Sequence, residues 1–179
     1  LQLQKITANL TVCINLIDEA EKKGIIIDSE NLSKKLGLDV VEVCAKKHFG
    51  MEALLKAVEN GKQKNPIINI FYSDKEETAL FELTDYLNKK INTDINTRWI
   101  AEKILENDKK VIDKLSEKIG YDIKNDIIIK DILNKHAINP HAFRDEVSQQ
   151  TVKKAKEVAD EVIIFKKKIY NQDDSLNKT

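Results

Sequence analysis

Short apolar runs separated by polar, helical segments characterise the first 60 residues. Residues 10–14 and 40–43 are the two strongest apolar runs, and residues 51–60 have the character of a helix. A strand that is apolar along its length is typical of a parallel sheet with helices on both faces. Between the two runs, Ser29 is the predicted N-cap of a short helix that ends at Gly37. We therefore predict a βαβ unit, whose parallel strands place their C-terminal ends at one edge of the sheet.

From residue 73 onward the apolar positions follow a helical period. Leu80, Leu83, Leu87 and Ile91 recur at steps of three and four residues. Further helices are predicted at 98–107, after Thr97 as N-cap, from Asp108 as N-cap to Gly120, at 125–135, and from Asn139-Pro140 onward. The last of these places five residues on one stripe, which predicts packing in a bundle: Val147, Thr151, Ala155, Val158 and Val162.

These patterns predict an α/β part followed by an all-α part. A chain of 179 residues suits one large or two small domains. We place the α/β part at residues 1–72, with a further strand at 67–72, and the helical domain at residues 73–170. Residues 171–179 are polar, and we expect them to form a disordered tail.

Composition removes several classes of function. Lys plus Arg and Asp plus Glu both number 30, so there is no basic excess to favour nucleic-acid binding. No apolar run approaches the roughly 20 residues that a membrane helix needs. The histidines His48, His136 and His141 share no metal-ligand spacing. Cys13 and Cys44 each lie at the end of a strand predicted to be buried, and we expect both to act as small apolar residues.

The run Asn15-Leu16-Ile17-Asp18 directly follows the first apolar strand. A strand that delivers Asn-x-x-Asp resembles the base-recognition motif of guanine-nucleotide-binding domains. The Asp18 carboxylate can accept two hydrogen bonds at once, from guanine N1–H and the N2 amine, and adenine has no such pair of donors. Each charge-assisted bond contributes about 1.5–3 kcal/mol, and Asn15 would brace the loop. Alone the motif is weak, because Asn and Asp also cap many turns and helices.

A second motif, Cys44-Ala45-Lys46, ends the second apolar strand. In guanine-nucleotide-binding domains the corresponding strand carries Ser-Ala-Lys, in which the alanine N–H binds guanine O6 and the lysine stem covers one face of the base. Cysteine for serine exchanges one small side chain for another. Ligands of open α/β sheets bind at the edge where both motifs lie. Together they predict a guanine-binding pocket formed by Asn15, Asp18, Cys44, Ala45 and Lys46.

Longer stretches of the sequence resemble the cytosolic region of the ferrous iron transport protein B (FeoB) family. Residues 15–28 fit its pattern N-x-x-D-E-A-x-x-x-G-I-x-I-D, residues 32–37 fit L-S-x-x-L-G, and residues 98–108 are similar to its R-W-[LI]-A-x-K-L-L-E-x-D helix. The resemblance covers most of the chain. Three positions depart from the expected residues. Leu16 stands where many GTPases have lysine, although this family commonly has an apolar residue there, Asp39 replaces a proline, and Cys44 replaces Ser or Thr.

The resemblance implies a cytosolic fragment of a GTP-binding Fe²⁺ transport protein: the C-terminal half of a P-loop GTPase-type parallel sheet plus a small helical bundle. GTP or GDP is the implied ligand, of which this chain would contact only the guanine part. No G-x-x-x-x-G-K-[ST] loop occurs in the sequence, so the groups that hold the phosphates and Mg²⁺ are absent from it. We expect them upstream of Leu1, a membrane domain downstream of Thr179, and no GTPase activity from this chain alone.

The implied partners are the remainder of the same transporter, and a homo-oligomer is a further option; nucleic acid is not expected. The implied location is the cytoplasmic face of the bacterial inner membrane, with this fragment itself soluble. Two other interpretations stay open at this point. The chain could be a stand-alone helical interaction module, or it could belong to another GTPase family that acts in translation. The Arg98-Trp99 helix and the neutral net charge weigh against the latter.

Overall fold

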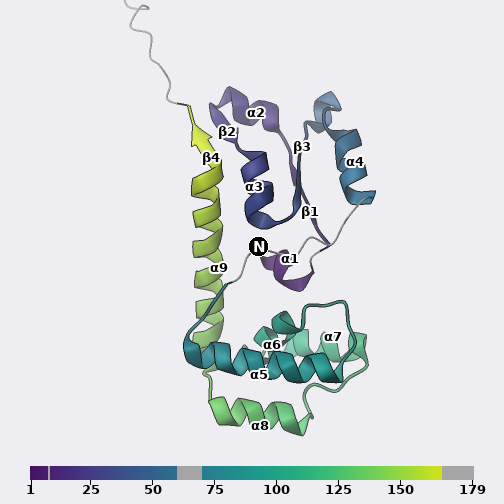
Figure 1. The fold of residues 1–179 in the computed structure, drawn as a ribbon, viewed down its shortest axis with the longest axis vertical. Coiled ribbons are helices and arrows are strands. Elements are labelled where there is room, and N and C mark those ends of the chain that lie inside the picture. The colour runs from purple at the N-terminus through teal and green to yellow at the C-terminus, as the bar shows by residue number, and fades with distance from the viewer. Residues whose placement is uncertain (8, 60–69, 167–179) are drawn as a thin grey trace, which may run out of the picture.

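The computed structural model describes residues 1–7, 9–59 and 70–166 (Figure 1). The predicted tail and most of the strand predicted at 67–72 lie outside these residues, and residues 70–72 are not in a strand. The elements follow one another in the order α1 (Gln2–Ile6), β1 (Thr11–Ile14), α2 (Ile17–Lys22), β2 (Ile25–Ile27), α3 (Ser29–Leu36), β3 (Asp39–Glu42), the 3₁₀ turn η1 (Ala45–Lys47), α4 (Met51–Glu59), α5 (Asp74–Lys90), α6 (Thr97–Leu105), α7 (Lys109–Ile119), α8 (Ile127–His136), α9 (Pro140–Val162) and β4 (Ile163–Phe165).

Two small sheets organise the described strands. β1 pairs with β3 in parallel, with Thr11 opposite Asp39 and Ile14 opposite Glu42. This is the parallel pair that the two apolar runs predict. The second sheet was not predicted: β2 pairs in antiparallel fashion with β4, which follows the long helix α9 (Figure 1).

A large apolar core lies within the helical part. Leu80, Leu83 and Leu87 on α5 are completely buried, and Ile91 packs against the same core, as the helical period predicted. Arg98 of α6 donates to Glu77 Oε1 on α5 at 2.8 Å. The other buried members of this core are Ile70, Tyr72, Ala79, Ile100, Ala101, Ile104, Leu105, Ile112, Leu115, Ile123, Ile129 and Phe143.

Local capping chemistry sets the helix ends, with small shifts from the predicted residues. Asp108, Gly120 and Asn139 cap α7 and α9 as predicted. The N-cap of α6 is Asn96 rather than Thr97, because the Asn96 side-chain oxygen Oδ1 accepts a hydrogen bond from Arg98 N at 3.0 Å. In the same way Asp28, rather than Ser29, caps α3.

Helix α9 extends beyond the bundle. Thr151 is buried, but Ala155 is exposed, which contradicts the continuous stripe predicted for this helix. Farther along, Val158 packs with Leu36 and Leu38 of the α/β part instead of with the bundle. Figure 1 shows α9 running from the helical layer to β2 and α3. The prediction of bundle packing therefore holds only for the first half of the helix.

Candidate functional site

The end of β1 turns sharply into α2. Asn15 Oδ1 accepts a hydrogen bond from Leu16 N at 2.8 Å, and Leu16 has a left-handed backbone with φ +60°. Left-handed backbone is uncommon outside glycine, asparagine and aspartate, so the Asn15 bond helps to hold it. The turn places Asp18 in the first turn of α2, beside the end of the neighbouring strand.

The end of β3 forms a tight loop at the same edge of the sheet. Val43 N donates to Ile14 O at 2.8 Å, which extends the contact between the two strands. Cys44 and Phe49 then exchange both backbone hydrogen bonds, at 3.1 and 3.2 Å, and close the loop that contains η1. The loop returns to α4 at Gly50, which also has a left-handed backbone, with φ +76°.

Side chains from the two loops meet at the Asp18 carboxylate. Cys44 Sγ donates to Asp18 Oδ1 at 3.2 Å, and Lys47 Nζ lies 3.0 Å from Asp18 Oδ2. The hydrogen bond from Lys47, and after it the one from Cys44, lower the pKa of Asp18 below its usual value. The three side chains line a pocket of about 280 Å³ together with Ile17, Glu21 and Phe49.

The five residues named from the sequence differ in their placement. Asp18 and Cys44 are in contact and line the pocket. Asn15, Ala45 and Lys46 lie in the same two loops but are exposed, and they are not among the residues lining it. Lys47 is the contact that the sequence did not single out. It follows Lys46 directly, and nothing in a run of two lysines indicates which one turns toward Asp18.

Cys13 contradicts the expectation that both cysteines are buried. Cys44 is only 2% exposed, whereas Cys13 is exposed. Side chains of a strand point to the two faces of the sheet in turn, so the face of β1 that carries Cys13 is not covered by the described residues.

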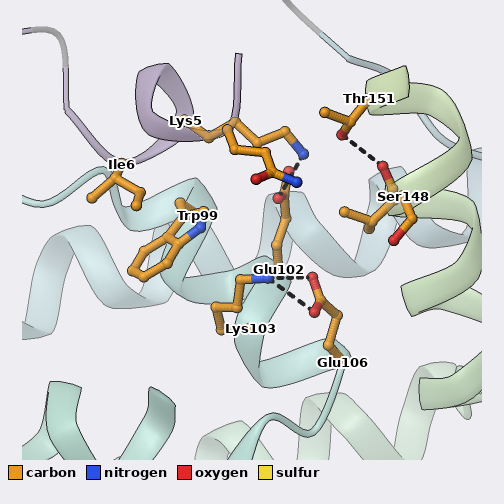
Figure 2. A pocket seen from close by; sticks show the side chains of 10 residues that line it. Lys5, Ile6, Trp99, Glu102, Lys103, Glu106, Ser148 and Thr151 are labelled. Atoms are coloured by element: carbon orange, nitrogen blue, oxygen red, sulfur yellow. Dashed lines mark hydrogen bonds and ion pairs between the residues drawn. The ribbon is translucent and has the colours of Figure 1, made fainter. Parts of the chain in front are cut away.

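A second hollow, of about 270 Å³, lies between α1, α6 and α9 (Figure 2). Its buried carboxylates have cationic partners: Lys5 Nζ lies 2.9 Å from Glu102 Oε2, and Lys103 Nζ lies 2.7 Å from Glu106 Oε1. Tyr72 also donates to Glu102 Oε1, at 3.0 Å. Both carboxylates are therefore neutralised by lysines. The Lys5–Glu102 ion pair connects α1 to the helical part.

The described residues contain no group of three or more His, Cys, Asp and Glu side chains arranged to hold a metal ion. His136 instead contacts Glu82, with Nε2 and Oε2 3.0 Å apart. Over the same residues, every helix is too short or too polar to cross a membrane.

A parallel βαβ segment with Asn-x-x-Asp and Cys-Ala-Lys at one edge, followed by a helical domain, defines the class: the C-terminal part of a GTPase-type α/β domain joined to a helical bundle. Family models agree in both parts. The model described as ferrous iron transport protein B matches residues 1–58, and the model described as FeoB cytosolic helical domain matches residues 72–164. The chain belongs to the FeoB family and represents part of its cytosolic region.

Individual relatives agree with this assignment. The chain is 31% identical over 111 residues to the Fe(2+) transporter FeoB of Escherichia coli K12, which covers 60% of this chain and 14% of that protein. It is 32% identical over 118 residues to an Fe(2+) transport protein A/FeoB fusion protein of Porphyromonas gingivalis, covering 62% of this chain and 14% of that protein. The matched region thus spans about one seventh of these relatives.

Solved structures show the same fold. The cytosolic domain of the Thermotoga maritima FeoB iron transporter, in a GDP form, matches 91% of this chain and 59% of that chain, with a TM-score of 0.68 and 22% identity. The cytosolic domain of Legionella pneumophila FeoB matches 87% of this chain and 57% of that chain, with a TM-score of 0.63 and 22% identity. The predicted family and fold class are confirmed, and the alternative of another GTPase family is wrong.

Proposed function

We propose that this chain supplies the guanine-recognising part of a nucleotide-binding domain in an Fe²⁺ transport protein. The observation that carries the proposal is the 3.2 Å contact between Cys44 Sγ and Asp18 Oδ1, made at the carboxyl ends of two adjacent parallel strands. Ligands of open α/β sheets bind at this edge. Relatives support the choice of ligand: the T. maritima cytosolic domain is described in GDP and GMPPNP forms, and a Streptococcus thermophilus FeoB G-domain variant is described as GDP-bound.

Each residue of the proposed site has a distinct role. Asp18 accepts from guanine N1–H and N2–H, and Cys44 orients its carboxylate. Asn15 braces the turn through Leu16 N. The Ala45 backbone N–H faces guanine O6, and the Lys46 stem covers one face of the base. No residue of this chain receives a hydrolytic role, since its sequence holds no phosphate-binding loop.

The helical domain, residues 73–170, would couple the nucleotide domain to the membrane part of the transporter. Two connections support this role. Lys5 of α1 binds Glu102 of α6 where the α/β part meets the helical part, and β4 at the C-terminal end of α9 pairs with β2 (Figure 1). The partners would then be the remaining G-domain half and the membrane domain, at the cytoplasmic face of the membrane.

Replacing Asp18 by Asn tests base recognition. The change is best made in a cytosolic region as long as the solved relatives, so that phosphate-binding groups outside these 179 residues are included. An asparagine amide presents a donor where guanine also donates, whereas xanthine has a carbonyl there. We expect preference to shift from GDP toward XDP by about 3–5 kcal/mol, on the order of several hundred-fold or more.

Asp113→Asn is the matched control, because Asp113 pairs with Lys124 in the helical part, away from the pocket. It should leave the preference for GDP unchanged. If Asp18→Asn also leaves that preference unchanged in a competition between GDP and XDP, Asp18 does not contact the base. The α/β part would then be structural, and a helical interaction module would be the better description of the chain.

A further inference from the structure

We propose that Lys47 closes the base pocket by binding Asp18, and that a guanine base enters by displacing it. This inference rests on the proposed function, because it concerns the same carboxylate. It adds a residue that lies outside both sequence motifs and whose side chain competes with the ligand.

Both oxygens of the Asp18 carboxylate already have a partner. Oδ1 accepts from Cys44 Sγ at 3.2 Å, and Oδ2 lies 3.0 Å from Lys47 Nζ. A guanine edge presents two parallel donors, N1–H and N2–H, that require these same two oxygens. In the closed pocket two side chains, Cys44 and Lys47, therefore occupy the oxygens that the two donors of a base would contact.

The two partners differ in how readily they can leave. Cys44 is 2% exposed and fixed by its paired backbone bonds to Phe49. The Lys47 side chain is 59% exposed, and Asp18 is 17% exposed. An ion pair with one exposed, flexible partner contributes little to stability, because water and the freedom of the lysine side chain oppose it. Lys47 is therefore the exchangeable partner. Each oxygen of an ionised carboxylate has two lone pairs, so Oδ1 can keep its bond from Cys44 and also accept from the base once Lys47 has moved.

The loop backbone allows the side chain to move without rearrangement. The Cys44–Phe49 bridge and the turn at Gly50 fix the ends of the loop, so only the lysine side chain has to swing away. Glu21 lines the same pocket, and its charge also attracts Lys47. A displaced ammonium group thus has a second carboxylate at the pocket rim, which lowers the cost of opening.

The test uses GDP titrations of the same cytosolic region as above, by calorimetry, for the wild type and four variants. Lys47→Met removes the competitor and should tighten GDP binding roughly two- to five-fold, the range set by an exposed ion pair. Lys47→Arg keeps the ion pair and should bind GDP no more tightly than the wild type. Lys22→Met removes a cation that acts on Asp18 only through space, and should change the affinity by less than about two-fold.

Asp18→Asn, the fourth variant, separates this inference from the proposed function. If Asp18→Asn loses the preference for GDP while Lys47→Met binds GDP as the wild type does or more weakly, Lys47 is not a competitor and only this inference is overturned. If Asp18→Asn keeps that preference, the base site itself is wrong and both proposals fail. Tighter binding by Lys47→Met alone, with Lys47→Arg and Lys22→Met near the wild type, supports the closed pocket.

Discussion

At the scale of single residues, Tyr72 is a buried polar side chain whose hydroxyl has two charged partners. Its ring packs edge-on against Phe143, with centroids 5.1 Å apart. Its hydroxyl accepts from Lys5 Nζ at 2.7 Å and donates to Glu102 Oε1 at 3.0 Å. Burial, and then the nearby Glu102 carboxylate, raise the pKa of Tyr72 far above its ordinary value.

The raised pKa of Tyr72 predicts a loss of stability in alkali. The unfolded chain ionises tyrosine near pH 10, whereas folded Tyr72 stays protonated well above that. Its stabilising contribution is therefore fully present below about pH 10 and is lost as the pH rises further. A spectrophotometric titration of the folded protein should show that a fraction of its tyrosines ionises only well above pH 10. This fraction should be smaller in Tyr72→Phe. Urea-unfolded wild type is the control, and an unchanged late fraction in Tyr72→Phe would contradict the prediction.

Gly50 ends the loop that lines the pocket, and Gly120 at the end of α7 is a matched control for a substitution there. Both have left-handed backbones, with φ +76° and +65°. A Cβ at Gly50 would overlap Glu42 O and lie 3.2 Å from Val43 Cα, whereas a Cβ at Gly120 meets nothing within 4 Å. Gly120→Ala should therefore cost only the strain of the left-handed backbone, about 1–2 kcal/mol, and Gly50→Ala should cost more, about 2–4 kcal/mol. Urea denaturation measures both, and equal losses would refute the proposed overlap.

At the scale of elements, the pairing of β2 with β4 is the least local contact between strands. Ile25–Ile27 lies near the start of the chain and Ile163–Phe165 near the end of the described residues. Asp28 N donates to Val162 O at 2.8 Å, and Lys166 N donates to Gly24 O at 2.7 Å, so the bonds continue past both ends of the ladder. This pairing holds the C-terminal end of α9 beside α2, the helix that carries Asp18.

Proline substitutions test this ladder. In antiparallel pairs, bonded and non-bonded positions alternate. The hydrogen bonds donated by Asp28 N and Lys166 N therefore place Ile164 at a bonded position and Phe165 at a non-bonded one. Ile164→Pro should open the ladder, because proline has no N–H, and should speed amide exchange at Asp28 and Lys166 by at least about ten-fold. Phe165→Pro is the control and should have a smaller effect. Equal exchange in both variants would show that the ladder contributes little.

At the scale of the whole molecule, far more apolar side chains are buried in the helical part than in the α/β part. The large core contains buried residues from Ile70 to Phe143 only. The core near the α/β part contains Leu36, Leu38 and Val158 and little else that is fully buried. Cys13 on β1 is exposed, and α4 leaves Leu55 and Val58 largely exposed. Local stability follows apolar burial, so the two parts should differ in how readily they open.

Hydrogen exchange of the whole chain measures this difference. Amides of α5 and α6 should exchange through global unfolding, because their apolar faces are completely buried. Amides of β1 should exchange through smaller openings and at least about a hundred-fold faster. Low urea concentrations should accelerate α5 and α6 while leaving β1 nearly unchanged. Equal, strong protection of β1 and α6 in a monomer would contradict the prediction.

Local chemistry made much of this molecule predictable from its sequence. The apolar runs predicted the parallel pair β1 and β3, because runs rich in β-branched residues favour extended strands. The period of Leu80, Leu83 and Leu87 gave the buried face of α5. Capping rules placed Asp108, Gly120 and Asn139 at helix ends, since these side chains and backbones act on groups only a few residues away. The same locality made the two loop motifs recognisable.

Contacts between distant segments were decided only by the tertiary structure. The β2–β4 pairing joins two short isoleucine-rich runs, and neither run indicates its partner. The exposure of Ala155 depends on where α9 leaves the bundle. The exposure of Cys13 depends on which face of β1 is covered. Lys47 rather than Lys46 meets Asp18, because the Cys44–Phe49 bridge fixes the path of the loop. Sequence patterns show which hydrogen bonds and apolar contacts a segment needs. Only the folded chain determines which distant segments provide them.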